Sequence, residues 1–194
     1  MRATEVLSTE HRAIERVLRI LTTAAAGLDQ GQDIPPATFE RLVDFLRNFA
    51  DRCHHGKEET LLFPALVRKG ISKEGGPVGV MLEDHEAGRR YIRGLSEAVE
   101  AYKRNEPGAR DAIARNARGY ADVLTRHIFK EDHVLFRMAD QVLTPAEQEE
   151  LVSGFERIED EEIGAGVHES YHRMIGELEK EFGLQEKATE PAEH

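Results

Sequence analysis

The sequence predicts an all-α fold, namely an antiparallel up-down four-helix bundle with one or two additional short C-terminal helices. Apolar residues recur at helical spacing along nearly the whole chain, and no run alternates apolar and polar residues over five or more positions as a half-buried strand would. The long helical segments are joined by short connections rich in glycine or proline, which favours antiparallel neighbours.

Two long amphipathic segments make up the first half of the chain. Helical spacing of apolar residues over about 4–28 predicts the first helix. Pro35 and Pro36 suit the start of the next helix, because the first turn makes no use of a backbone N–H. This second helix should cover about 37–69. Pro64 lies inside it and removes one backbone hydrogen bond, which predicts a kink or an early end.

Two further long helices are predicted in the second half. Four glycines between residues 70 and 79 indicate a loop. One helix should then extend to about Lys103, and another should run from about Pro107 to Met138. Each keeps an apolar stripe over seven residues or more, which is typical of a helix that faces a core.

The C-terminal region should add two short helices. The residues TPAE at 144–147 have the form of a capping box with proline in the first turn, so a helix should begin there. Two glycines then interrupt the pattern before a last helix. The chain is therefore divided into a bundle at 1–140, a helical extension packed on it at 141–183 and a flexible tail at 184–194.

The composition excludes several classes of protein. The 194 residues fit one domain with a small appendage. A net charge of −11 argues against nucleic acid and membrane surfaces as partners, since both bind basic patches. Cys53 is the single cysteine, and neither an apolar leader nor a membrane-spanning stretch is visible, so we expect a cytoplasmic protein. The oligomeric state is not indicated.

A repeated motif relates the two halves. The residues HHGKEETLLF at 54–63 match HIFKEDHVLF at 127–136 with five identities. A shorter echo pairs EHRA at 10–13 with DHEA at 84–87, at nearly the same offset. The chain is therefore a duplicated two-helix unit, in which the first helix supplies one histidine and the second helix supplies His-x-x-x-Glu.

The repeated residues predict a metal site. Residues four apart lie on the same side of a helix, so each His-x-x-x-Glu motif presents an imidazole and a carboxylate together on the buried face. A hydrogen-bonded polar core without metal is the alternative, but the symmetric set favours two metal ions. Imidazole and carboxylate suit zinc, iron, manganese or nickel, so the residues alone do not select the metal. The six candidate ligands are His11, His54, Glu58, His85, His127 and Glu131.

The arrangement of these six residues, with Leu-Phe after each second-helix motif, resembles the hemerythrin-like HHE cation-binding family over about residues 7–139. The resemblance implies a four-helix bundle around a non-haem di-iron centre, with the two iron ions bridged by an oxo or hydroxo group. It further implies that His11 and His54 bind one iron, that His85 and His127 bind the other, and that Glu58 and Glu131 bridge them.

The fifth histidine of oxygen-carrying family members is not in its usual place. Those members have a His-x-x-x-His pair on one helix, whereas Met81 and Arg89 stand four residues before and after His85. A set of four histidines and two glutamates is similar instead to the iron-centre repair proteins of the family. His55 is either a fifth nitrogen ligand or a surface histidine, and its counterpart Ile128 favours neither.

Several other residues have roles that the pattern does not decide. Glu59 and Asp132 are interpreted as solvated acids or as acids that orient a ligand imidazole, rather than as ligands. Cys53 is interpreted as a small buried hydrophobic residue, and His168 and His172 as surface or capping residues.

Two residues on the buried faces also need an explanation. Gly88 allows either a close helix contact or room for a diatomic ligand, and we favour the close contact. Tyr120 should point its hydroxyl into the bundle, where the hydroxyl needs a partner.

His133 is expected to be exposed.

The resemblance implies a protein that binds or senses dioxygen, nitric oxide or peroxide, or that handles iron. The alternative is a di-iron enzyme, such as a peroxide or nitric oxide reductase or an iron donor for cluster repair. An enzyme would need a redox protein partner to supply electrons, because the sequence shows no second redox cofactor motif. A nitrogen-rich ligand set favours binding of a small ligand over extensive oxidation chemistry.

Overall fold

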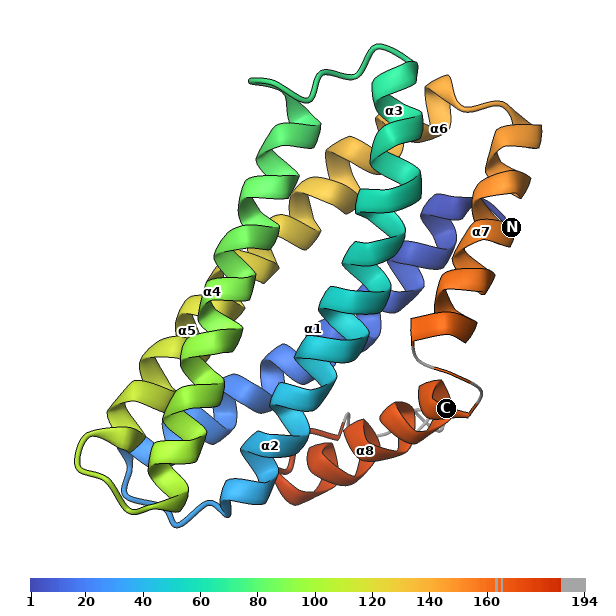
Figure 1. Cartoon of the computed structure of the whole chain (residues 1–194). Coiled ribbons are helices and arrows are strands. Elements are labelled where there is room, and N and C mark those ends of the chain that lie inside the picture. The colour runs from blue at the N-terminus through green and yellow to red at the C-terminus, as the bar shows by residue number, and fades with distance from the viewer. Residues whose placement is uncertain (163, 165, 186–194) are drawn as a thin grey trace, which may run out of the picture.

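The computed structural model describes residues 1–162, 164 and 166–185, and this part of the chain is helical with no β-strand (Figure 1). The predicted all-α class is therefore confirmed. The predicted tail at 184–194 lies almost wholly outside the described residues. Within the described ranges, no helix combines the length and the apolar character needed to cross a membrane.

The first half folds into two long helical segments. The first is α1 (Ala3–Asp29), within a residue of the predicted range at each end. The second starts at Pro36, one residue before the predicted start, and ends one residue before the predicted limit. It consists of α2 (Pro36–Phe45), η1 (Leu46–His55), η2 (Glu58–Leu62) and α3 (Phe63–Arg68).

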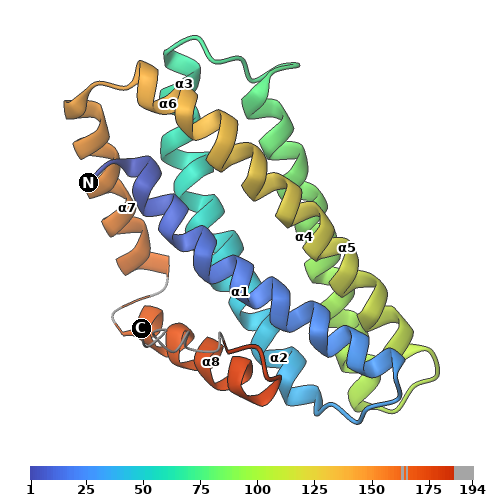
Figure 2. The ribbon, with the colours of Figure 1, turned by 180° about the vertical axis from the view of Figure 1, so that it is seen from behind.

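The second half repeats this plan. Its first long segment is α4 (Pro77–Lys103), and its second is α5 (Ala109–Lys130), continued by η3 (Glu131–Leu135) and α6 (Phe136–Val142). Figures 1 and 2 show the four long segments side by side, with successive segments running in opposite directions. α5 packs against α1 and α4, while α2 and η1 pack against the other faces of α1 and α4.

A π-helical turn occurs at the glutamate of each repeated motif. η2 begins at Glu58 and η3 at Glu131, and in each case the N–H of the residue five positions later, Phe63 or Phe136, donates to the glutamate carbonyl. Pro64 predicted a kink or an early end, and the early end is wrong, because α3 continues to Arg68. Pro64 lies in the first turn of α3, directly after the π turn, where its missing N–H is not needed.

Two shorter helices follow, α7 (Pro145–Glu162) and α8 (Val167–Glu181). The predicted capping box is present: the Thr144 N–H donates to Glu147 Oε2 at 2.8 Å, and the Glu147 N–H donates to Thr144 Oγ1 at 3.4 Å. α7 packs against α1, η1 and η2, and α8 packs against α1. Both therefore lie on the side of the molecule away from α4 (Figures 1 and 2).

Two apolar clusters fill the space between the helices, and a polar layer lies between them. On α1, Leu7 belongs to the smaller cluster and Ile14 to the larger, and His11 lies between them. On the α5 segment, Leu124 of the larger cluster and Leu135 of the smaller likewise flank the histidine and the glutamate. The fold therefore holds the polar residues away from water on both sides.

Gly88 brings α4 close to α5. A Cβ atom at Gly88 would stand 3.2 Å from Leu124 Cδ2 and 3.5 Å from Tyr120 Cε2. The space beside Gly88 is already filled by these two side chains. This packing supports a close helix contact as the reason for glycine, rather than room for a diatomic ligand.

We expect Gly88→Leu to lower the free energy of unfolding by about 1–3 kcal/mol, because the new side chain would overpack the contact with Tyr120 and Leu124. Gly176→Ala is the control, since no atom lies within 4 Å of its Cβ position, and it should raise the free energy of unfolding by about 0.5–1 kcal/mol. Urea unfolding measures both. A Gly88→Leu protein as stable as the wild type would contradict the packing described above.

Candidate metal centre

The residues of the repeated motifs meet in the polar layer. All six predicted ligands are at most 1% exposed, although they are polar and ionisable, and His55 is 2% exposed. Each of the four long segments supplies at least one of them. His11 comes from α1, His54 and His55 from η1, Glu58 from η2, His85 from α4, His127 from α5 and Glu131 from η3.

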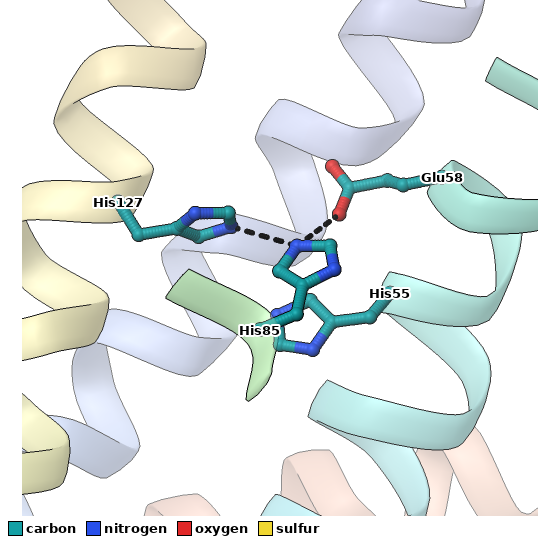
Figure 3. A group of neighbouring side chains, drawn as sticks. All are labelled: His55, Glu58, His85 and His127. Atoms are coloured by element: carbon teal, nitrogen blue, oxygen red, sulfur yellow. Dashed lines mark hydrogen bonds and ion pairs between the residues drawn. The ribbon is translucent and has the colours of Figure 1, made fainter. Parts of the chain in front are cut away.

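The side chains form two groups that share Glu58. Within each group the potential ligand atoms all lie within 4.8 Å of one another. The pairing of histidines is the one that the family resemblance implies, whereas metal binding by these residues stays a prediction. One group contains His55, Glu58, His85 and His127 (Figure 3), and the other contains His11, His54, Glu58 and Glu131.

Each glutamate faces an imidazole of both groups. This is the arrangement that two bridging carboxylates require. Glu58 lies 3.3 Å (Oε2) from His85 Nε2 and 3.7 Å (Oε1) from His54 Nε2, and Glu131 Oε2 lies 3.2 Å from both His11 Nε2 and His127 Nε2.

His55 joins the centre, so its interpretation as a surface histidine is wrong. Its ring stacks on that of His85 with the centroids 3.8 Å apart. Its Nδ1 lies 3.3 Å from Asp51 Oδ1, and Asp51 also accepts a hydrogen bond from Arg89 Nε at 2.9 Å. A fifth imidazole is therefore present, supplied by η1 instead of α4. The counterpart Ile128 makes this addition specific to one half.

The inward-facing atoms of the centre fit a cation. Burying a polar atom without a partner costs about 1–3 kcal/mol, and native proteins rarely leave several such atoms together. Both groups would supply nitrogen and oxygen donors to a divalent metal. Among the described residues, the buried atoms without a hydrogen-bond partner include Nε2 of His11, His54 and His55 and both carboxylate oxygens of Glu58 and Glu131.

In two of the histidines, Nδ1 points away from the centre and is hydrogen-bonded to the acid that comes directly after Glu58 or Glu131 in the sequence. His11 Nδ1 lies 2.8 Å from Asp132 Oδ1, and His85 Nδ1 lies 2.7 Å from Glu59 Oε1. In each case the acid belongs to the other half of the chain. The interpretation of Glu59 and Asp132 as acids that orient an imidazole is supported, since such hydrogen bonds turn Nε2 toward the metal position.

The outward nitrogens of two more imidazoles face acids that the sequence analysis did not single out. His54 Nδ1 lies 2.7 Å from Glu10 Oε2, and His127 Nδ1 lies 3.5 Å from Asp84 Oδ2. The short echo of the repeat contained the signal, because Glu10 and Asp84 occupy equivalent positions in EHRA and DHEA. No comparable repeat could have indicated Asp51.

The electrostatics of the centre without a cation are unfavourable. Burial, together with the facing carboxylate of Glu131, raises the pKa of Glu58 well above its ordinary value. Burial lowers the pKa of His54 to about 4. Burial alone would also lower the pKa of His127, but the carboxylates of Glu131 and Asp84 together outweigh it and raise that pKa to about 9. A cation would remove the repulsion between the two carboxylates.

The remaining candidate residues take no part in the two groups. Cys53 is buried, and burial raises its pKa to about 12, which supports its interpretation as a small hydrophobic residue. His133 is exposed, as predicted. Tyr120 is buried, but its hydroxyl has no hydrogen-bond partner among the described residues. His168 stacks on Phe49 near the surface, outside both groups.

Comparison with known proteins identifies the family. The sequence profile of the hemerythrin HHE cation binding domain matches residues 2–139, which include every residue of both groups. The chain belongs to this family. The helices α7 and α8 lie beyond the part of the chain that matches the HHE domain.

Relatives of this HHE protein occur in mycobacteria. An uncharacterized protein of Mycobacterium bovis and another of Mycobacterium tuberculosis are each 25% identical to it over 182 residues, which cover 94% of this chain and 71% of the relative. These matches extend past the HHE domain and include the region of α7. No solved structure matches the chain.

Loss of a shared glutamate should empty this HHE centre more than loss of His55. Glu58→Ala removes a ligand from both groups and is expected to retain less than about half of the wild-type metal, with Glu131→Ala similarly depleted. His55→Ala should retain more, because it removes one of three imidazoles from one group. Metal analysis of the purified variants, with the exposed His133→Ala as control, measures this order. Equal retention in all variants would contradict the bridging assignment.

Metal removal should destabilise the protein. A metal held at a hundredfold excess over its Kd adds about 2.7 kcal/mol, equivalent to about 5–10 °C in melting temperature for a chain of this size. Lowering the pH through about 6.5 should act in the same direction, because protons compete for the imidazoles. Thermal unfolding with and without a strong chelator, at pH 7.5 and pH 5.5, tests both effects. Identical melting curves would mean that the cluster is satisfied without metal.

Proposed function

We propose that this protein is a di-iron HHE protein that binds or senses dioxygen, nitric oxide or peroxide at the centre of an antiparallel four-helix bundle. The observation that carries the proposal is the convergence of unpartnered, buried nitrogen and oxygen atoms into two groups that share Glu58. Two cations, with an oxo or hydroxo group between them, would use these atoms and neutralise the facing carboxylates.

The donor chemistry supports iron. Imidazole is a borderline ligand and carboxylate a hard one, a mixture that suits iron, and the described residues bring no thiolate into either group. A single tetrahedral structural zinc would use four ligands and leave the remaining donors buried without partners. A pair of ions sharing two carboxylates accounts for all of them.

The two positions differ in how many ligands the chain can supply. If both glutamates bridge, the position of His55, His85 and His127 receives five protein ligands, and that of His11 and His54 receives four. Iron commonly takes six ligands, so the second position would keep more room for an added molecule. We therefore place the exogenous ligand on the side of His11 and His54.

The chain's own residues would prepare this position. Asp132 and Glu10 orient the rings of His11 and His54, and Phe136 stacks on His11 with the centroids 5.4 Å apart. The two apolar clusters exclude bulk water from both sides of the layer. A small, weakly polar molecule suits such an environment better than a charged substrate. The iron would supply the redox chemistry of ligand binding.

The cytoplasm is the proposed location. A reduced cysteine and a ferrous centre both suit a reducing compartment, and Cys53, the single cysteine, is buried without a disulfide partner. A redox protein partner would be needed only if the bound molecule is reduced catalytically.

The experiment is metal analysis and spectroscopy of protein purified without oxygen after iron-replete expression. We expect about two metal ions per chain, mainly iron, and a visible absorption spectrum that changes when air, nitric oxide or azide is added. Glu131→Ala should lose the change, and the exposed variant His133→Ala should retain it. A metal content near zero would refute the proposal. Steady turnover of peroxide or nitric oxide in the presence of an electron donor would show that the protein is a reductase rather than a ligand-binding protein.

A further inference from the structure

A chain of hydrogen bonds connects the metal centre with the C-terminal extension. His54 Nδ1 lies 2.7 Å from Glu10 Oε2, and the other oxygen of Glu10 accepts a hydrogen bond from Lys57 Nζ. Lys57 Nζ also donates to Glu159 Oε2 on α7 at 3.1 Å. Glu159 Oε1 in turn lies 3.9 Å from His168 Nδ1 on α8. Both C-terminal helices therefore meet at Glu159.

The equivalent position in the other half is open to solvent. Lys130 corresponds to Lys57 in the repeat, and it donates to Asp84 as Lys57 donates to Glu10. The side chain of Lys130 is nevertheless 36% exposed, whereas that of Lys57 is 0% exposed. The lysine–acid pair is therefore buried in the first half of the chain and partly exposed in the second half.

Helix α7 covers Lys57. It packs against η1 and η2, and Gly154 approaches so closely that a Cβ atom there would lie 2.6 Å from Leu61 Cδ1. Phe155 of α7 is buried in the smaller apolar cluster. This contact removes the Lys57 ammonium from water and leaves Glu159, whose side chain is 35% exposed, as its second charged partner.

A buried ammonium is stable only when charged groups replace its lost water. With Glu159 in place, Lys57 is held between two carboxylates, and Glu10 can keep its second oxygen on His54. Without Glu159, Lys57 would have Glu10 as its only acid and a less defined position. The order of Glu10, and thereby the direction of the His54 ring, depends on a residue of α7.

We propose that α7 controls how tightly the His11–His54 position holds its metal, with Glu159 as a positioning residue that acts through Lys57 and Glu10. This inference rests on the proposed function and concerns its regulation. Any event that lifts α7 from η1 and η2 would loosen this position selectively. If both glutamates bridge, this is the position with fewer protein ligands, so the extension would govern the more open half of the centre.

The test compares metal release from Glu159→Gln, wild-type protein and Glu156→Gln into a strong chelator. Glu156 is an exposed residue of the same helix and serves as the matched control. We expect Glu159→Gln to accelerate the loss of one of the two ions by about 10-fold and to leave the other ion at the wild-type rate. The loss of Glu159 would loosen Glu10, the residue that orients the His54 ring, and so weaken that position. Glu156→Gln should release both ions at the wild-type rate.

Two further measurements separate positioning from general destabilisation. Hydrogen exchange without metal should accelerate over 50–58 in Glu159→Gln, but not over 127–135. In a Lys57→Met background, Glu159→Gln should have no further effect on release, because the connection to Glu10 is already lost.

Three outcomes would overturn the inference. Equal acceleration of both ions would indicate a general structural role for Glu159. Release of both ions from Glu159→Gln at the wild-type rates would refute the positioning role of Glu159 without contradicting the proposed function. A wild-type protein without bound metal would refute both the proposed function and the role of Glu159.

Discussion

Burial of seven ionisable side chains in the middle of a helical protein is the constraint on which the rest of the structure depends. Five imidazoles and two carboxylates lie at most 2% exposed, and each would cost several kcal/mol without partners. Acids on the outer side of the layer hydrogen-bond to Nδ1 of His11, His54 and His85, and Nε2 of His11, His54 and His55 and the carboxylate oxygens of both glutamates remain for a cation. The directions of the rings are thus set by the folded chain itself.

The repeat of a two-helix unit explains why each half of the chain can bury its own histidines and glutamate. A few residues present in only one half make the two halves different. Each glutamate begins a π turn, and each following acid binds the histidine of the other half, so the halves interlock. One half then adds His55 with Asp51, and the same half is capped by α7 through Lys57. A symmetric scaffold has become a centre with two unequal positions.

Much of this arrangement could be predicted from the sequence, because helical periodicity and a ten-residue repeat are local patterns. The long helices and the meeting of the six repeated residues follow from such patterns. The π turns do not, since hydrogen bonds five residues apart leave no compositional mark, and Pro64 predicted a kink or an early end instead. The burial of His55 depends on how η1 faces α4, and the contact of Glu159 with Lys57 joins residues 102 positions apart. Both are tertiary facts that no spacing rule contains.

The sharing of Glu58 between the two groups has a thermodynamic consequence for loading. A cation in either position would fix the carboxylate and neutralise part of its charge, so the same residue meets the second cation already oriented. The two binding events are therefore linked, and by reciprocity each position must alter the affinity of the other by the same factor. If the repulsion between the cations outweighs this orientation, the second ion binds more weakly than the first, and chains carrying a single ion accumulate when the metal is scarce.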